Sequence, residues 1–181
     1  MALRPELRVL SICSGVGGLD LGLHLALARS GFTPRTVCYV EREAFAAACL
    51  VARMEEGALD LAPVWSDLGT FDPRPWRGLV DCIAGGIPCQ PFSTAGKQAG
   101  ADDARHLWPR TRELVVELAP QLVCIENVAN HLSSGTRDLA RDLQELGYET
   151  ACTLLRASDV GAPHRRERLF IVGARVADSA R

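Results

Sequence analysis

The chain has 181 residues, of which 48% are hydrophobic and 23% are charged, and its formal net charge at pH 7 is −2. This length and composition predict one soluble globular domain, and the seven scattered cysteines without a CxxC pair argue against a disulfide framework or a metal site. No uninterrupted apolar run approaches the roughly 20 residues of a membrane helix, and residues 1–9 carry no secretory signal, so we expect a cytoplasmic protein without a membrane contact.

The chain opens with an apolar run, a glycine loop and a helical pattern. Residues 7–13 predict a strand, the sequence SGVGG at 14–18 predicts a loop, and leucines then recur at the spacing of a helix that includes Asp20. Such a loop presents backbone N–H groups at a helix N-terminus, which suits the carboxylate or phosphate of a nucleotide-like cofactor. A tight turn without a ligand would produce the same glycine cluster.

Two carboxylates follow that suit a nucleotide-like cofactor. Residues 36–40 predict a second strand that ends in Glu41, and residues 44–56 predict a helix. A carboxylate there, roughly 20 residues after a glycine loop, is positioned to accept hydrogen bonds from ribose hydroxyls, although a solvated charge at a strand end is the alternative. Asp67, in a proline-punctuated stretch, is a candidate partner for an adenine amino group, or equally a cap or turn residue.

The stretch DCIAGGIPCQPFSTAGK at residues 81–97 is the centre of the predicted site. Its apolar part predicts a buried strand that ends in Gly85 and Gly86, which places Cys89 at the carboxyl end of that strand. The two glycines let the backbone approach a ligand, and Pro88 limits where the cysteine sulfur can point. A thiol held in this way is a candidate nucleophile, whereas simple packing is the alternative for an unpaired cysteine.

The second half of the chain adds one carboxylate and an arginine cluster. Its predicted elements are helices at 107–118 and 135–146 and strands at 122–125, 148–155 and 169–172. Glu126 follows the first of these strands and can face Cys89 across the edge of a sheet, or be a solvated strand-end acid. The arginines at 165–168 suit a phosphate or a base carbonyl, or form a solvated face.

Strands and helices alternate along the whole length. This alternation predicts an α/β doubly wound, Rossmann-like sheet with helices on both faces and with functional residues at the carboxyl ends of the strands. The order of the strands in the sheet cannot be read from the alternation.

Four stretches, taken in order, carry a resemblance to a known family. They are SGVGGLDLGL at 14–23, YVERE at 39–43, GGIPCQPFS at 85–93 with ENV at 126–128, and GAPHRRERLFIVG at 161–173. Together they resemble the catalytic half of the cytosine-C5 DNA methyltransferases of bacterial restriction-modification systems and phages. The resemblance covers residues 9 to about 172.

The resemblance implies an S-adenosylmethionine-dependent methyltransferase fold, S-adenosyl-L-methionine as cofactor, double-stranded DNA as partner and no metal. It implies that Cys89 attacks C6 of a flipped cytosine, that Glu126 acts at N3, and that the arginines hold the catalytic site and the base's O2. The implied catalytic residues are Cys89, Glu126, Arg166 and Arg168. The implied cofactor-binding residues are Ser14, Gly15, Gly17, Gly18, Glu41, Asp67 and Pro88, and the implied DNA-binding residues are Gln90, Ser93 and Lys97.

The chain also departs from the family pattern. Cys13 stands where the family usually has phenylalanine. The resemblance implies a catalytic and cofactor-binding domain at 1–176, a truncated tail at 177–181 and no target-recognition domain, so we expect a truncated product or a second chain that supplies the missing half.

Two other functions fit parts of the sequence. One is a catalytically silent S-adenosylmethionine-binding fragment or subunit that needs a partner chain for DNA recognition. The other is a nicotinamide-dependent oxidoreductase, which would leave Pro-Cys-Gln and Glu-Asn-Val without a role.

Overall fold

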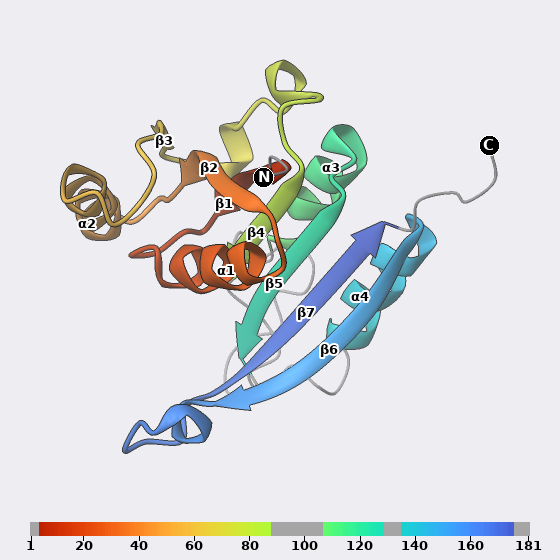
Figure 1. Ribbon diagram of the computed structural model, residues 1–181. Coiled ribbons are helices and arrows are strands. Elements are labelled where there is room, and N and C mark those ends of the chain that lie inside the picture. The colour runs from red at the N-terminus through yellow and green to blue at the C-terminus, as the bar shows by residue number, and fades with distance from the viewer. Residues whose placement is uncertain (1–3, 88–106, 129–134, 176–181) are drawn as a thin grey trace, which may run out of the picture.

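The computed structural model describes residues 4–87, 107–128 and 135–175, and within these ranges the chain folds into one sheet with flanking helices (Figure 1). The strands are β1 (Glu6–Ile12), β2 (Thr33–Val40), β3 (Val64–Trp65), β4 (Cys82–Gly86), β5 (Leu122–Val128), β6 (Tyr148–Arg156) and β7 (Glu167–Arg175). The α-helices are α1 (Gly18–Arg29), α2 (Ala44–Glu55), α3 (Trp108–Leu118) and α4 (Gly135–Glu145). Short 3₁₀ turns lie at η1 (Leu68–Thr70), η2 (Arg74–Trp76) and η5 (Ala157–Val160).

The sheet has the order β3-β2-β1-β4-β5-β7-β6. Strands β1 to β5 pair in parallel, whereas β7 runs antiparallel to both of its neighbours, β5 and β6. The chain winds outward in one direction from β1 and in the other from β4, so the carboxyl ends of β1 and β4 meet at the point where a doubly wound sheet opens a crevice.

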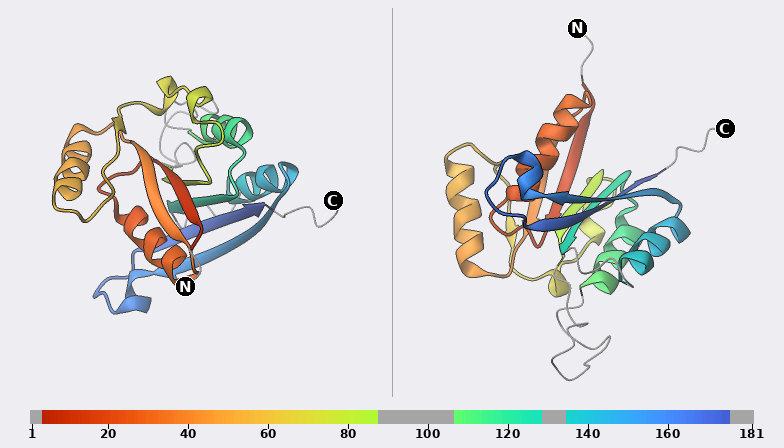
Figure 2. Two further views of the ribbon diagram at one scale, coloured as in Figure 1. Left: turned by 45° about the horizontal axis from the view of Figure 1, so that its top comes forward. Right: turned by 90° about the horizontal axis from the view of Figure 1, so that it is seen from below.

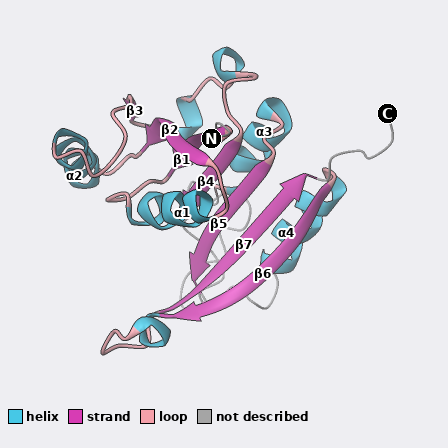
Figure 3. Cartoon of the chain, in the orientation of Figure 1, coloured by secondary structure: helices cyan, strands magenta, loops and turns pink. Residues whose placement is uncertain are grey.

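Helices cover both faces of the sheet, as Figures 2 and 3 show. Along β1, Leu10 and Ile12 belong to the same core as residues of α3 and α4, whereas Leu7 and Val9 pack with Leu27 of α1. A second small core joins β2 to α2 on the α1 side. Alternate residues of a strand point to opposite faces, and these apolar residues therefore form a three-layer domain.

The expected doubly wound fold is confirmed, with two differences near the predicted site. We expected the strand before Glu126 to end at residue 125, but β5 continues to Val128 because Glu126 pairs with Phe170 of β7. We expected the last strand to begin at residue 169, but β7 begins at Glu167, so Arg168 lies within it, opposite Val128. In the described ranges no helix has the length and apolar character to cross a membrane.

Candidate active site

The glycine loop turns the chain from the end of β1 into α1. Cys13, Gly15 and Gly17 have φ values of +48°, +55° and +80°, a left-handed region that favours glycine. A Cβ on Gly17 would also lie 2.6 Å from the Leu59 side chain. Helix α1 begins at Gly18 without a side-chain cap, so its first N–H groups are left for a ligand or water.

Glu41 joins this loop to the second strand. Its Oε2 accepts a hydrogen bond of 2.7 Å from Gly15 N, and its Oε1 accepts one of 2.7 Å from Glu43 N. Burial, together with the nearby Glu41 charge, raises the pKa of the Cys13 thiol to about 12. The structure thus brings together the loop and the strand-end carboxylate that the sequence paired only by spacing.

Ser14 and Asp67 both bond to the protein itself. Ser14 is buried, its N–H donates to Val40 O at 3.2 Å, and its hydroxyl lies 2.9 Å from that of Ser11. Asp67 caps η1, because its Oδ1 accepts a hydrogen bond of 3.0 Å from Gly69 N. The cap expected as one alternative for Asp67 is therefore present, whereas its contact with adenine stays a prediction.

Glu126 and Arg168 form an ion pair on neighbouring strands. Arg168 Nε lies 2.5 Å from Glu126 Oε1, and each side chain is about one quarter exposed, at 26% and 27%. The two residues meet because β7 pairs with β5, although they are far apart in sequence. A partly buried ion pair of this kind restrains the direction of the carboxylate.

Glycines of β4 make room for this carboxylate. A Cβ on Gly86 would lie 3.1 Å from Glu126 Oε2, and a Cβ on Gly85 would lie 2.7 Å from the carbonyl oxygen of Ile12. The absence of a side chain at Gly86 leaves room for Glu126, and its absence at Gly85 lets β1 lie close to β4. The sequence had suggested instead that these glycines leave room for a ligand. Gly86 is only three residues before Cys89, so Glu126 is oriented toward the end of β4 from which the cysteine segment departs.

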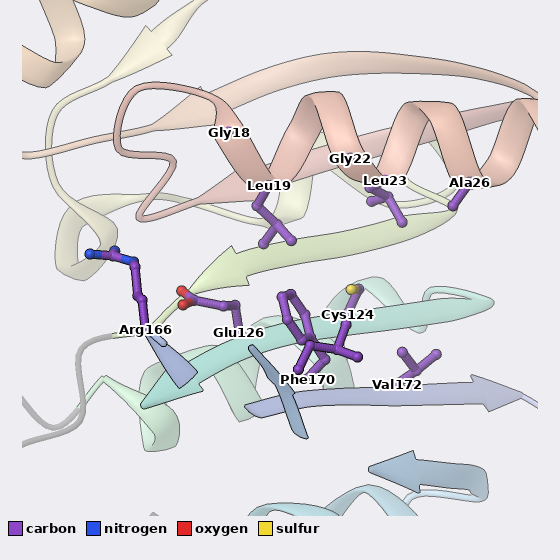
Figure 4. A pocket seen from close by; sticks show the side chains of 11 residues that line it. Gly18, Leu19, Gly22, Leu23, Ala26, Cys124, Glu126, Arg166, Phe170 and Val172 are labelled. Atoms are coloured by element: carbon purple, nitrogen blue, oxygen red, sulfur yellow. The ribbon is translucent and has the colours of Figure 1, made fainter. Parts of the chain in front are cut away.

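An apolar cavity of about 590 Å³ lies between α1 and strands β5 and β7 (Figure 4). Leu19 and Leu23 of α1 face Phe170 of β7 across it. Glu126 and Arg166 line the end of this cavity nearest to the tip of β4, and Arg166 is exposed. A charged end on an apolar trough gives the site both a polar and a hydrophobic side.

Five predicted site residues lie outside the described residues, and the rest, apart from Asp67 at the start of η1, divide into two groups. Those outside are Pro88, Cys89, Gln90, Ser93 and Lys97. The glycine loop and Glu41 form one group, and Glu126, Arg166 and Arg168 form the other. Across the described ranges, no three metal-ligating side chains gather into a possible metal site.

Sequence reasoning missed two polar residues beneath the glycine loop. Ser11 and Asp20 are 2% and 1% exposed, and they lie 3.0 Å apart through Ser11 Oγ and Asp20 Oδ2. The available signal was that Asp20 and His24, four residues apart, place polar groups on one side of an otherwise leucine-rich helix.

Comparison with known proteins shows the same fold and family. Residues 7–180 match the sequence model described as C-5 cytosine-specific DNA methylase. The chain is 39% identical over 172 residues to the type II methyltransferase M.NaeI of Lentzea aerocolonigenes, covering 92% of this chain and 40% of that protein. It is 35% identical to M.NgoMIV of Neisseria gonorrhoeae, with 90% of this chain and 50% of that protein covered. It is 30% identical to M.AquIA of a Picosynechococcus strain, with 94% of this chain and 73% of that protein covered.

This chain aligns with about half the length of solved structures that share its fold. A Spodoptera frugiperda DNMT2 mutant aligns with a TM-score of 0.75 at 24% identity, covering 96% of this chain and 51% of the other. A putative DNA modification methyltransferase encoded within an E. coli prophage aligns with a TM-score of 0.70 at 28% identity, covering 93% and 47%. The chain spans half or less of the first curated relatives it matches, M.NaeI and M.NgoMIV, and its match to the family extends over nearly its whole length. The chain belongs to the C-5 cytosine-specific DNA methylase family.

Proposed function

We propose that this chain is the catalytic and cofactor-binding part, residues 1–176, of a DNA (cytosine-5-)-methyltransferase that uses S-adenosyl-L-methionine. The observation that carries the proposal is the Glu126–Arg168 ion pair, which directs a carboxylate to the tip of β4, three residues before Cys89. The family match supports the same reaction.

The residues around the glycine loop suit S-adenosylmethionine. The uncapped start of α1 is favourable for the ligand carboxylate, and Glu41, already bonded to Gly15, has the acceptor chemistry for ribose hydroxyls. Added Cβ atoms at Gly15 and Gly18 would meet no protein atom within 4 Å, so the loop has an open side. When bound, the cofactor supplies an electrophilic methyl group. We assign Asp67 to the adenine end, where its second carboxylate oxygen can accept from the amino group.

The nucleophile in this proposal is Cys89. Its thiolate adds to C6 of a cytosine that has left the duplex stack, and the electron pair displaced from the C5–C6 bond makes C5 nucleophilic toward the methyl group. Loss of the C5 proton to a base then restores the double bond and expels the thiolate. Glu126 forms a hydrogen bond with N3 of the base as negative charge develops on the ring. Arg168 holds the Glu126 carboxyl group in position for this contact.

Basic and polar side chains take the DNA contacts. Arg166 is exposed beside Glu126, where a guanidinium can bind the base's O2 or a phosphate. We assign Gln90, Ser93 and Lys97 to the flipped nucleotide and its phosphates. Because the formal net charge is −2, these local groups have to provide the attraction that phosphate binding requires.

A second candidate function is a cofactor-binding part that needs a further segment or partner chain for DNA recognition and catalysis. The favouring observation is the apolar trough beside Glu126, with Leu19, Leu23 and Phe170 along it. In the described part of the chain, Figure 1 shows no helix over this face of β7 and β6. An apolar surface of this kind next to a reaction site suits coverage by another segment.

Two measurements on the purified chain separate these functions. Transfer of a labelled methyl group to mixed-sequence duplex DNA reports catalysis, and calorimetric titration with S-adenosylmethionine reports cofactor binding. We expect Cys89→Ala to abolish transfer and keep binding, and Glu41→Ala to weaken binding. Comparable transfer by wild type and Cys89→Ala would refute the nucleophile assignment, whereas binding without transfer by wild type would favour the second function.

A further inference from the structure

A buried carboxyl group beneath the glycine loop has no role in the chemistry described above. Asp20 is only 1% exposed, in the first turn of α1. Its Oδ2 lies 3.0 Å from Ser11 Oγ, and its Oδ1 has no hydrogen-bond partner. An ionised carboxylate buried with one oxygen unpartnered is costly, and the N-terminal position on a helix offsets only a part of that cost.

The hydroxyl groups beside Asp20 decide where its proton belongs. Ser11 Oγ lies 2.9 Å from Ser14 Oγ as well as 3.0 Å from Asp20. Ser14 Oγ in turn lies 3.2 Å from Ser11 O and 3.4 Å from Val40 O, which can only accept. Each hydroxyl has one proton. With an ionised Asp20, Ser11 donates to the carboxylate and Ser14 donates to Ser11, which leaves Ser14 Oγ beside two carbonyl oxygens with no proton for either. If Ser14 donates to a carbonyl oxygen instead, Ser11 cannot donate to both Ser14 and Asp20.

With a carboxylic acid at position 20, Asp20, Ser11 and Ser14 can each donate one proton to the next acceptor, and the last proton reaches a carbonyl oxygen. We propose that Asp20 is a positioning residue that stays a neutral acid: it donates to Ser11, Ser11 donates to Ser14, and Ser14 donates to the carbonyl oxygen of Ser11 or Val40. This series holds the start of the loop against β1 and β2. The carbonyl oxygen left unpartnered on a neutral acid costs less than a buried charge would.

The surroundings of Asp20 agree with this protonation state. Burial is the largest influence and raises the pKa of Asp20, whereas the Ser11 hydroxyl, His24 and Asp20's own backbone N–H lower it, and the nearby Asp60 carboxyl has the smallest effect and raises it. Tyr39 of β2 and Cys82 of β4 also face it and acquire raised pKa values, mainly by burial. Of these neighbours only His24 could carry a positive charge that would hold Asp20 ionised.

The inference rests on the proposed function only in that the loop is taken to bind the cofactor. Amide hydrogen exchange at Ser14 and Gly17, whose N–H groups bond to Val40 O and Ser14 O, measures the loop without any ligand. We expect Asp20→Leu, which keeps a branched shape without a donor, to speed this exchange about tenfold. Asp20→Asn, whose amide N–H can replace the acid proton, should remain within about twofold of wild type.

A double-mutant cycle tests whether the hydrogen bonds act as one series. Ser11→Ala should have nearly the effect of Asp20→Leu, and the double variant should be little worse than either single one. Ser30→Ala is the matched control, because this exposed serine caps the C-terminal end of α1, where its hydroxyl donates to Ala26 O at 3.0 Å. Additive effects of Ser11→Ala and Asp20→Leu, or equal damage by Asp20→Asn and Asp20→Leu, would overturn the proposal.

The pH dependence of stability tests independently whether Asp20 is protonated in the folded protein. A raised folded-state pKa means that the stabilisation by Asp20 is full below its unfolded pKa of about 4 and is lost as the pH rises through the folded value. Asp20→Asn should therefore gain stability relative to wild type between pH 4 and pH 7. A difference that stays constant with pH, also in a His24→Asn background, would contradict a neutral acid.

Calorimetry with S-adenosylhomocysteine connects the loop to its ligand. We expect Asp20→Leu and Ser11→Ala to weaken binding about tenfold and Asp20→Asn to weaken it less than about threefold. If wild type does not bind S-adenosylhomocysteine, but Asp20→Leu still exchanges its loop amides faster than Asp20→Asn and wild type do, the cofactor assignment fails and the positioning role stands. If wild type binds and Asp20→Leu binds equally well, the positioning role fails.

Discussion

The two glycines at the end of β4 respond differently to an added methyl group. In Gly85→Ala the new Cβ would lie 2.7 Å from Ile12 O and 2.5 Å from Ile12 Cγ1, where ordinary contacts begin near 3.4 Å. The overlap of about 0.7 Å with a backbone atom can be relieved only by moving β4 away from β1. Overpacking of this kind costs about 1–3 kcal/mol, and for a chain of this size that lowers the Tm by about 2–12 °C.

In Gly86→Ala the nearest atom is instead the end of a flexible side chain. The Cβ would lie 3.1 Å from Glu126 Oε2, so the carboxylate has to shift by a few tenths of an ångström. Alanine in place of glycine returns about 0.5–1 kcal/mol of backbone entropy, so the stability should match wild type to within about 1 kcal/mol. In the proposed mechanism, however, the reaction depends on the placement of that carboxylate, and we expect methyl transfer to fall about tenfold.

Thermal unfolding and methyl-transfer rates of the two variants test this difference. Gly22→Ala in α1 is the control for a methyl group in open space, because its Cβ would meet nothing within 4 Å. The reasoning is refuted if Gly85→Ala unfolds at the wild-type temperature, or if Gly86→Ala is destabilised as much as Gly85→Ala.

Three further predictions concern charges and thiols. The Arg8 guanidinium lowers the pKa of Asp81, so Asp81→Asn should lose about 1–2 kcal/mol of unfolding free energy at pH 7. This loss should fade as the pH falls below about 4, because Asp81 of the wild type then becomes protonated. Equal losses at pH 7 and pH 3 in urea titrations would contradict this. Cys13, with a pKa of about 12, should react with iodoacetamide at pH 7.5 far more slowly than the exposed Cys152, as peptide mass spectrometry can measure. Arg168→Met removes the ion pair and should slow methyl transfer at least tenfold while cofactor affinity stays within about twofold, and a matching loss of affinity would argue against its assigned place.

Local patterns in the sequence predicted most of the helices and strands and the α/β fold class. Leucine spacing marks α1, apolar runs mark β1, β4 and β5, and the glycine loop marks the turn between β1 and α1. These features depend on residues close together in sequence, where helical and strand periodicity act directly. The same local patterns placed Glu41 and the glycine loop together at the carboxyl ends of the predicted strands.

Contacts between distant parts of the chain could not be predicted in this way. The Glu126–Arg168 pair exists because β7 inserts between β5 and β6 in antiparallel direction, and no local pattern encodes that order. The roles of Gly85 and Gly86 depend on which atoms face them from β1 and β5. Asp20 looked like an ordinary helix residue, because its burial follows from how α1 packs over β1 and not from its neighbours in sequence.

The central claim is that Cys89 attacks a cytosine placed beside Glu126. Fluorine at C5 blocks the last elimination, so incubation with S-adenosylmethionine and duplex DNA that contains 5-fluorocytosine should trap a covalent protein–DNA adduct, visible on a denaturing gel. We expect the adduct with wild type and none with Cys89→Ala. An adduct of equal yield from Cys89→Ala, or none from a wild-type chain that binds both cofactor and DNA, would contradict the account.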